Sequence, residues 1–353
     1  MTPLCRHFGA CGGCVHQDMA EGDYRARKRE AVYFALSRHG LGSFRVAETV
    51  EVPPGTRRRC VFKIARRNGA VEAGFHGRAS HRIVDMRECH VLTPALFALV
   101  EPLRAIMGEV LGEGEAAELH ATQADNGFDL ALRWRRKVTP ALTAAFAKWA
   151  SRNDVARITS GADILTELAR PALKIAGADV ALPPGAFLQA TREGELFLQA
   201  RVAEALKGAK AVADLFAGCG TFAFALARQA KVHAVESDEY MLTALASGAR
   251  GATRIRPVTT ERRDLFRSPL TARELDRFDA AVLDPPRAGA AAQIGEFARS
   301  RLRRIAYVSC NAETFARDAR ALVDAGFRMG DVVPVDQFLW SEHIELVSEF
   351  TRG

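Results

Sequence analysis

Hydrophobic positions recur with different spacings in the two parts of this chain. Up to about residue 180 the patterns are short and mixed, whereas beyond it apolar runs alternate regularly with helical segments. An Asn-Gly pair at 68–69 interrupts an alternating stretch, which is typical of a β-hairpin. The elements predicted in the first part are helices over 21–39, 95–111 and 140–150, a hairpin over 56–78, and strands over 128–134 and 154–159.

Pro183, Pro184 and Gly185 end the first part of the chain. Four apolar strands follow, separated by helical patterns: AVADLFA at 211–217, KVHAVES at 231–237, DAAVLDP at 279–285 and RIAYVSC at 304–310. Strands that alternate with helices are typical of a doubly wound, Rossmann-like α/β domain. We therefore predict three regions: a cysteine-containing basic region over 1–95, a mixed α+β central region over 96–180, and the doubly wound domain over 181–353.

The composition is that of a globular chain with a basic surface. Hydrophobic residues make up 48% and charged residues 26%, and no run of 18 apolar residues occurs. Because the N-terminus also lacks the apolar segment of a secretory signal, we expect a cytosolic protein without a membrane span. The net charge of +7 favours a polyanionic partner. Residues 57–67 hold six Lys or Arg, which form either a contact with such a partner or a solvated strand face.

The stretch VADLFAGCGTFAFALA at 212–227 has the pattern of a strand, a tight turn and the start of a helix. Gly218 and Gly220 allow the backbone to approach a ligand closely, and Glu236 at the end of the next strand can accept both hydroxyls of a ribose. The pattern G-x-G-x-x-A by itself also fits NAD. Asp214 before the turn, together with LDPPRAG at the end of a later strand, favours S-adenosylmethionine instead.

Cys310 follows an apolar strand, in the motif YVSCNAETFARD. Ligands of open α/β sheets bind outside the carboxyl ends of the strands, so Cys310 and Asp284 are expected at the same crevice. A thiolate beside a methyl donor has a chemical use, because its addition to carbon 6 of a pyrimidine makes carbon 5 nucleophilic. A base must afterwards remove the carbon-5 proton, and His343 and Glu345 are the candidates.

The motifs FLQAT, DLFAGCGTF, LDPPRAG, YVSCNAETFARD and HIE occur in this order. Together they resemble the RNA uracil-5-methyltransferase family, and the match covers essentially residues 183–350. The resemblance implies that Cys310 is the nucleophile and Glu345 the proton-abstracting base. The S-adenosylmethionine positions that it implies are Gln189, Phe216, Glu236 and Asp284, with Asp264 near the adenine.

The chain contains seven cysteines, an odd number that argues against a disulfide framework. Cys5, Cys11 and Cys14 are spaced as metal ligands, and Cys89 is the remaining candidate for a four-cysteine site. Zinc or an iron–sulfur cluster could occupy such a site, and the spacing does not choose between them. The chain resembles the ribosomal-RNA branch of the family, in its shorter type without an RNA-binding β-barrel, and this resemblance implies a [4Fe-4S] cluster.

The resemblance implies an enzyme that forms 5-methyluridine in RNA, with 23S ribosomal RNA as the target. We expect it to be a monomer, with neither DNA nor a membrane as a partner. The target uridine must leave its stack to reach the thiol, and Phe187 and Arg287 are candidates to stack on it. The alternatives are an enzyme acting on transfer RNA or on cytosine, and an inactive redox-sensing RNA-binding protein. The presence of Asp214, Glu236, Cys310 and Glu345 together argues against an inactive protein.

Overall fold

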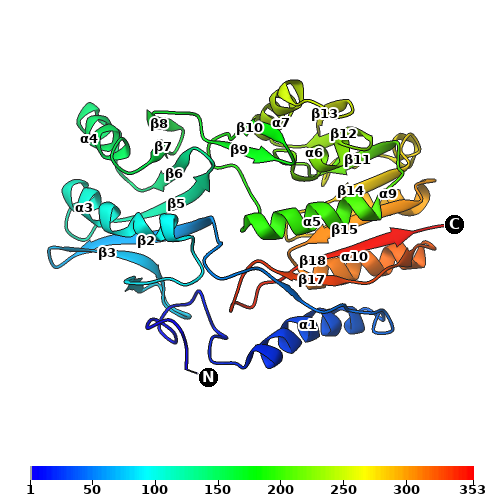
Figure 1. The fold of residues 1–353 in the computed structure, drawn as a ribbon, viewed down its shortest axis with the longest axis horizontal. Coiled ribbons are helices and arrows are strands. Elements are labelled where there is room, and N and C mark those ends of the chain that lie inside the picture. The colour runs from blue at the N-terminus through cyan, green and yellow to red at the C-terminus, as the bar shows by residue number, and fades with distance from the viewer. Residues whose placement is uncertain (1) are drawn as a thin grey trace.

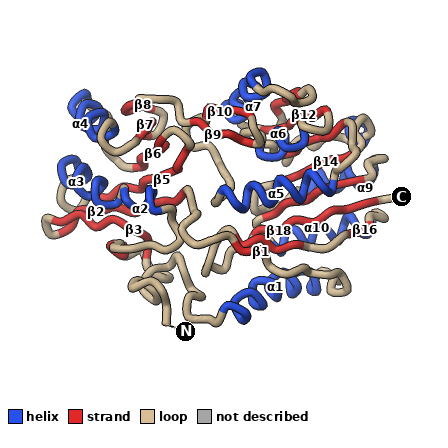
Figure 2. Tube along the Cα trace, in the orientation of Figure 1, coloured by secondary structure: helices blue, strands red, loops and turns tan. Residues whose placement is uncertain are grey.

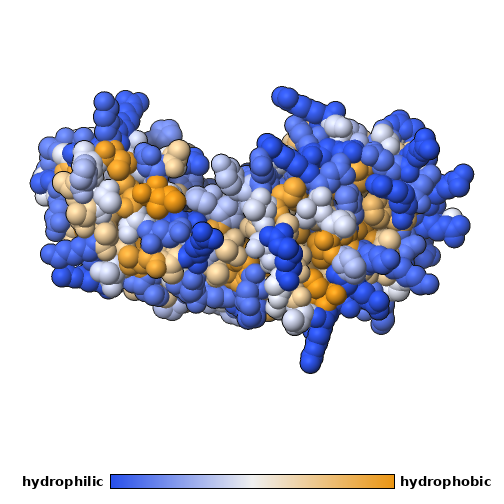
Figure 3. All heavy atoms as spheres, turned by 90° about the horizontal axis from the view of Figure 1, so that it is seen from above, coloured by the Kyte–Doolittle hydropathy of each residue, from blue (hydrophilic) through white to orange (hydrophobic). Residues whose placement is uncertain are grey.

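The structure, a computed structural model, describes residues 2–353. Figure 1 shows two lobes, one built on the strands of the first part of the chain and the other on the strands of the second. The surface narrows between the lobes when the molecule is seen from above (Figure 3). No helix among residues 2–353 has both the length and the apolar character needed to cross a bilayer.

Ten helices are present in the described residues. Their bounds are α1 Glu21–Arg38, α2 Pro94–Ala98, α3 Val100–Val110, α4 Pro140–Ala150, α5 Arg192–Ala205, α6 Thr221–Ala227, α7 Glu239–Gly251, α8 Ala272–Leu275, α9 Ala291–Arg299 and α10 Ala312–Asp324. The helices predicted over 21–39 and 140–150 are confirmed. The single helix predicted over 95–111 is two helices, α2 and α3, which meet at Leu99.

A seven-stranded sheet forms the first lobe, in the order β4-β3-β2-β5-β6-β7-β8. Its strands are β2 Arg59–Arg67, β3 Ala70–His76, β4 Ile83–Asp85, β5 Ala116–Ala124, β6 Gly127–Arg133, β7 Val155–Ser160 and β8 Asp163–Glu167. The predicted hairpin is the antiparallel pair of β2 and β3. Strand β5 was not predicted, and it joins this hairpin to β6. The division of the chain at residue 95 stays a prediction, although strands from both sides of it share this sheet.

A nine-stranded sheet forms the second lobe, in the order β1-β17-β18-β15-β14-β11-β12-β13, with β16 also pairing β18. Its strands are β1 Val50–Glu51, β11 Ala211–Leu215, β12 Lys231–Glu236, β13 Val258–Arg262, β14 Ala280–Leu283, β15 Arg304–Ser309, β16 Arg328–Met329, β17 Val333–Asp336 and β18 Glu345–Thr351. A separate hairpin joins β9 Ala172–Ile175 and β10 Ala178–Ala181. The four predicted apolar strands are β11, β12, β14 and β15.

Helices cover both faces of the nine-stranded sheet, as the doubly wound prediction requires. Val212 and Ala213 are neighbours in β11 and contribute to opposite cores, because successive side chains of a strand point to opposite faces. Helices α5, α6 and α7 pack on one face, and α1, α8, α9 and α10 on the other. The N-terminal helix α1 is therefore part of this lobe. Before it, residues 2–20 form an irregular loop that lies beside the first lobe (Figure 2).

Candidate active site and cysteine pocket

The carboxyl ends of β11, β12, β14 and β15 lie at one edge of the nine-stranded sheet, because these strands are parallel neighbours. Strand β18 runs antiparallel to β15, so its beginning lies at the same edge, where Leu346 pairs with Ser309. This arrangement brings Cys310, just after β15, together with Asp284, just after β14, and Glu345, the first residue of β18. We call this part of the sheet the carboxyl edge.

Cys310 sits on a loop that neighbouring side chains hold in place. Asn311 caps helix α10 by accepting the Glu313 N–H at 3.0 Å, and its amide donates to the Arg287 carbonyl at 3.1 Å. The pKa of Cys310 is raised to about 11, first by burial and then by the charges of Glu345 and Asp284, while Arg287 acts in the opposite direction. The thiol is therefore protonated in the free site at neutral pH.

Glu345 is buried, with 3% of its surface exposed, and its Oε2 has no hydrogen-bond partner among the described residues. Burial and the nearby Asp284 raise its pKa well above the ordinary value, and the Arg59 guanidinium opposes this shift. The other candidate base, His343, is exposed and packs its ring against Phe338. The unpartnered buried carboxyl group next to the thiol is thus Glu345.

Gln189 and Asp284 form part of one hydrogen-bonded chain across the carboxyl edge. The Gln189 side chain donates to Asp284 Oδ2 at 3.1 Å and accepts from Gln337 Nε2 at 2.8 Å. Burial raises the pKa of Asp284 to about 7, and the hydrogen bond from Gln189 lowers it. These two predicted cofactor residues therefore contact each other, and β14, which Asp284 follows, lies between β15 and β11 in the sheet.

Asp214 lies in β11 with 1% of its surface exposed, and neither carboxyl oxygen has a hydrogen-bond partner in the structure's described part. Burial, followed by the charge of Asp284, raises its pKa well above the ordinary value. A buried carboxyl group without a partner is unfavourable unless a ligand supplies one. The cationic methionine end of S-adenosylmethionine, which carries an ammonium and a sulfonium group, matches this requirement.

The turn after β11 has the conformation of a ligand-binding loop. Phe216 adopts φ +63°, which is rare for a residue with a side chain and is found at functional sites. Gly218 has φ +53°, and a Cβ at this position would point into open space. Its N–H donates to Glu236 Oε2 at 3.0 Å, so the acidic side chain lies directly against the turn. The turn therefore has open space for a ligand at Gly218, and the carboxylate of Glu236 lies beside that space.

Asp264 follows β13, the strand next to β12, and its Oδ1 accepts the Phe266 N–H at 3.0 Å. This bond orients the turn that presents Phe266, whose ring centroid is 5.4 Å from that of Phe216. Two aromatic rings near the acidic Glu236 fit a purine nucleoside. The chemistry of these residues therefore fits S-adenosylmethionine.

Arg59 is a member of this site that the sequence did not single out. It begins β2 of the other lobe, and its guanidinium lies 4.3 Å from the centroid of the Phe187 ring. Its pKa is lowered to about 10, first by burial and then by Arg57, whereas Glu345 and Cys310 raise it. The three consecutive arginines at 57–59 belong to the basic cluster that the sequence analysis noted as a possible contact with a polyanion. Only the contact between the two lobes shows that Arg59 is the one that faces the thiol.

The joint between the lobes is built by the neighbouring Arg58. Its guanidinium pairs with Glu195 at 2.6 Å, and both side chains are buried. Arg58 also donates from Nε to the Gln189 carbonyl at 3.1 Å. Breaking a buried ion pair is strongly destabilising, because one charge is left without a partner. The first lobe is thereby held against the carboxyl edge.

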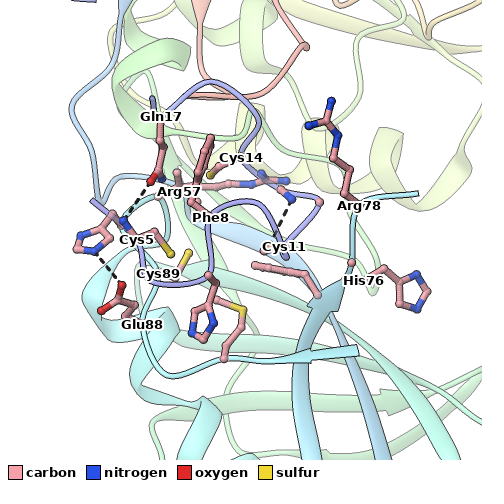
Figure 4. Close-up of a pocket in the computed structure, with 18 of the residues that line it drawn as sticks. Cys5, Phe8, Cys11, Cys14, Gln17, Arg57, His76, Arg78, Glu88 and Cys89 are labelled. Carbon is pink, nitrogen blue, oxygen red and sulfur yellow. Dashed lines mark hydrogen bonds and ion pairs between the residues drawn. The ribbon is translucent and has the colours of Figure 1, made fainter. Parts of the chain in front are cut away.

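A second cavity, of about 440 Å³, is lined by all four predicted metal ligands, Cys5, Cys11, Cys14 and Cys89 (Figure 4). We call it the cysteine pocket. Within its loop the Cys5 N–H donates to the Gln17 side chain at 3.1 Å, and the Gly12 N–H attaches the loop to the first lobe by donating to the His76 carbonyl at 3.0 Å. The four cysteines are free thiols.

The arrangement of these thiols agrees with the prediction only in part. Four cysteines from two distant segments do lie around one cavity, a donor set suited to iron–sulfur or zinc chemistry. However, no group of three or more His, Cys, Asp or Glu side chains in residues 2–353 is arranged to hold a metal ion. The iron–sulfur cluster therefore stays a prediction.

Comparisons with known proteins identify the family to which this chain belongs. The fold and the site define a methyltransferase that uses S-adenosylmethionine. The family model described as tRNA (Uracil-5-)-methyltransferase matches residues 251–350. A tRNA (uracil-54, C5)-methyltransferase of Pyrococcus abyssi, solved with S-adenosyl-L-homocysteine, has a similar fold, with a TM-score of 0.74 at 23% identity over 96% of this chain and 86% of its own.

Curated relatives extend the match to the whole chain. An uncharacterized RNA methyltransferase of Brucella suis is 42% identical over 353 residues, which are all of this chain and 85% of that protein. The 23S rRNA (uracil(1939)-C(5))-methyltransferase RlmD of Marinomonas posidonica is 31% identical, covering 98% of this chain and 80% of its own. This chain belongs to the RNA uracil-5-methyltransferase family, as its motifs predicted.

Proposed function

We propose that this protein forms 5-methyluridine in RNA, with 23S ribosomal RNA as its target, through a covalent bond between Cys310 and carbon 6 of the uracil. The observation that carries the proposal is the meeting of Cys310 and the unpartnered Glu345 at the carboxyl edge, beside Asp284. A nucleophile and a separate buried base are what addition and later elimination require.

The chemical steps assign separate roles to the residues of this edge. The Cys310 thiolate adds to carbon 6, and the electron pair of the carbon 5–carbon 6 double bond moves toward carbon 5 and its neighbouring carbonyl. S-adenosylmethionine, when bound, supplies an electrophilic methyl group to carbon 5. Glu345 then removes the carbon-5 proton, the double bond re-forms and the bond between Sγ and carbon 6 breaks. Asp214, Phe216, Gly218, Glu236 and Asp264 would hold the cofactor.

Two arginines favour the charged forms that these steps need. Arg287 lowers the pKa of Cys310, and Arg59 lowers that of Glu345. These two effects of the arginines act against burial. In the absence of ligands, burial keeps the thiol of Cys310 and the carboxyl group of Glu345 protonated. Arg59, stacked on the half-exposed Phe187, also offers a flat cation and an aromatic ring to an unstacked base. We propose that the flipped uracil lies beside this pair.

The ribosomal target is supported by the similarity to RlmD, which spans nearly the whole chain. Transfer RNA is the second candidate, because the family model bears that description, but it matches only residues 251–350. Labelled methyl transfer to unmodified 23S ribosomal RNA and transfer RNA, followed by mapping of the modified uridine, distinguishes them. Methylation of transfer RNA alone would overturn the ribosomal target, and absence of transfer to either RNA would overturn the proposed activity.

We also propose that Cys5, Cys11, Cys14 and Cys89 hold a [4Fe-4S] cluster. A single ion needs ligands that converge on one point, whereas a cubane has an iron at each of four corners and needs thiolates spread around a larger space. The four cysteines line a cavity of about 440 Å³ together with other residues, and a space of this size supports the larger group. Iron and acid-labile sulfide measured on anaerobically purified protein test this, and one zinc in place of iron would overturn it.

A further inference from the structure

Helices α2, α3 and α4 pack on one face of the seven-stranded sheet, and no helix of residues 2–353 joins a core on its other face. Cys60, Phe62 and Ile64 of β2 point into a core that helices α2, α3 and α4 complete. The alternate residues of β2 point to the opposite face, where Lys63 lies across from Glu118 of β5. Glu118 in turn lies across from Arg133 at the end of β6. This open face is polar and charged.

Two adjoining hollows lie where β2 and β6 end and β5 begins. The first, of about 590 Å³, has five lysine or arginine residues in its lining against two carboxylates; the cations are Lys63, Arg67, Arg133, Arg135 and Arg136. The second, of about 630 Å³, shares Arg133, Trp134 and Arg136 with the first and adds Lys137. The shared residues join the hollows into one surface, bordered by residues 133–137, which we call the basic segment.

The charges of the basic segment are largely uncompensated. Arg136 pairs with Glu115 at 3.1 Å, but exposed Arg133, Arg135 and Lys137 form no ion pair among the described residues. Trp134 anchors the segment, since its Nε1 donates to Ser160 Oγ at 2.9 Å. Like charges held close together repel one another, so their fixed clustering points to a polyanionic ligand.

The basic segment lies far from the thiol but on the same sheet. Arg59 and Arg67 mark the two ends of β2, and the eight steps between them, at ~3.3 Å each, place those ends about 26 Å apart. Arg59 is at the carboxyl edge, whereas Arg67 lines the first hollow. An RNA whose target uridine lies at Cys310 can therefore contact the basic segment only if the RNA extends about 26 Å or more from that uridine.

We infer that the basic segment and its hollows bind the phosphate backbone of the RNA substrate, at a site separate from the one that takes the target uridine. This inference rests on the proposed function. Exposed arginine and lysine side chains without partners match phosphates, which position an RNA without reading its sequence.

The test compares two triple variants on two RNAs. Arg133→Ala, Arg135→Ala and Lys137→Ala are combined in one variant. Its matched control combines Lys210→Ala, Arg303→Ala and Arg328→Ala, three exposed cations that also form no ion pair within residues 2–353 and lie at the edge of the large sheet opposite the carboxyl edge. One RNA is a long 23S fragment, and the other is a short stem-loop that carries the same uridine but ends before the basic segment.

With the long RNA, the first variant should show a KM raised about tenfold or more at physiological salt, with kcat unchanged. Its plot of log(kcat/KM) against log salt should be shallower by about 2, since three phosphate contacts are lost. With the short RNA, variant and wild type should agree. Equal effects on both RNAs, or the same effect in the control, would overturn the inference.

Failure of the proposed function is recognised separately. If the wild type methylates neither RNA, filter binding of the labelled long fragment still decides whether the first variant alone loses affinity. If polyglutamate binds the wild type as tightly as RNA does and only the first variant loses it, the ligand is an acidic protein segment and the RNA assignment is wrong.

A second observation concerns the loop 337–344, which leads to Glu345 and which we call the base loop. Lys28 of α1 donates from Nζ to Asp336 at 3.0 Å and to the His343 carbonyl at 2.6 Å, so one ammonium joins both ends of the loop. The middle is held as well, because the Trp340 N–H donates to the Tyr24 hydroxyl at 2.7 Å. Lys28 and Asp336 are both buried.

The base loop is also attached to the cysteine pocket. The Trp340 carbonyl accepts the N–H groups of Val15 and His16 at 2.6 and 3.1 Å, and Val15 directly follows Cys14. We propose that Lys28 is a positioning residue for Glu345, acting with the segment after Cys14. This too rests on the proposed roles of Cys310 and Glu345.

Lys28→Met keeps the length of the side chain and removes its charge, and Lys28→Arg keeps the charge. Arg29→Met, on the exposed side of α1, is the matched control. Lys28→Met should slow elimination about tenfold more than it slows thiol addition, so a covalent RNA–protein band accumulates during turnover, and Lys28→Arg should partly reverse this. Equal slowing of both steps would indicate a merely structural role and overturn the proposal.

Hydrogen exchange provides a readout without RNA. Amides of 337–344 should exchange faster in Lys28→Met than in Arg29→Met, while those of β11 and β14 stay protected. Unchanged exchange in the loop would overturn the positioning role even if the enzyme is active. If the wild type forms no covalent band but the loop exchange changes as expected, the catalytic assignment fails and the structural link remains.

Discussion

The carboxyl edge and the cysteine pocket differ in how their side chains are held. At the carboxyl edge, Asp284, Cys310 and Glu345 follow or begin strands of one sheet, so backbone hydrogen bonds set their positions before any ligand binds. In the cysteine pocket, three of four thiols lie on an irregular loop held by a few hydrogen bonds. The first site should therefore keep its shape without its ligand, whereas the second should depend on one.

The largest effect is expected for Cys310→Ala at the carboxyl edge. Without the thiolate, carbon 5 is not activated, so methyl transfer should be undetectable and no covalent RNA adduct should form. Because the edge is held by strands, the variant should still bind S-adenosylmethionine and melt near the wild-type temperature. Substantial activity, or the same RNA-shifted band on a denaturing gel, would show that another residue is the nucleophile.

Glu345→Gln separates the two ends of the covalent cycle. The thiol should still add and the methyl group should still be transferred, but the adduct should persist, because elimination lacks its base. Loss of a general base reduces turnover by about 10²–10⁴-fold. The gel that detects no band for Cys310→Ala should detect a stable one here. A variant that turns over normally would point to His343 as the base.

Cys14→Ser tests whether the cysteine pocket needs a ligand to hold its shape. If a [4Fe-4S] cluster is present, anaerobic protein should be brown with about four iron atoms per chain. The variant should lose this iron and with it soluble protein. Cys60→Ala is the control, since this buried thiol is not in the pocket lining and should leave the iron in place. Iron retained by Cys14→Ser would remove this cysteine from the ligand set.

Glu236→Ala should weaken cofactor binding without abolishing the fold. Losing a hydrogen bond to a charged acceptor costs about 1.5–3 kcal/mol, which raises the dissociation constant for S-adenosylmethionine about 10- to 100-fold. Calorimetric titration measures this. Glu239→Ala, at an exposed position of α7, should leave the constant unchanged. Tight binding of NAD by the wild type would contradict the cofactor assignment.

The smallest expected effect concerns the pH dependence of Cys310 in the free protein. Its pKa of about 11 means that raising the pH removes the thiol proton, so alkylation should accelerate about tenfold per pH unit between pH 8 and 10. Mass spectrometry of the 310-containing peptide follows the reaction, with Cys310→Ala as the reference. A rate that is already constant at pH 8 would show that the free site holds a thiolate.

Local patterns predicted much of the large sheet. Strands β11, β14 and β15 are apolar runs buried on both faces, so hydrophobicity alone marks them, and β12 keeps buried apolar residues at Val232, Ala234 and Val235. Strand β5 was missed because AAELHATQA has few β-branched or aromatic residues. It is a strand because β2 and β6 pair with it on either side. This pairing cannot be predicted from the nine residues of β5 alone.

The sequence by itself determined which groups are available for chemistry: a thiol after a strand, a tight glycine turn, and an acidic residue at the end of the strand that follows this turn. These features are local, since a strand end and the residue that follows it are neighbours in the chain. Only the tertiary structure decided that Arg59 faces Cys310 and that Lys28 fixes the base loop. Both contacts join segments hundreds of residues apart, and they form because the buried charges and apolar faces of separate elements find their partners only when the whole chain is folded.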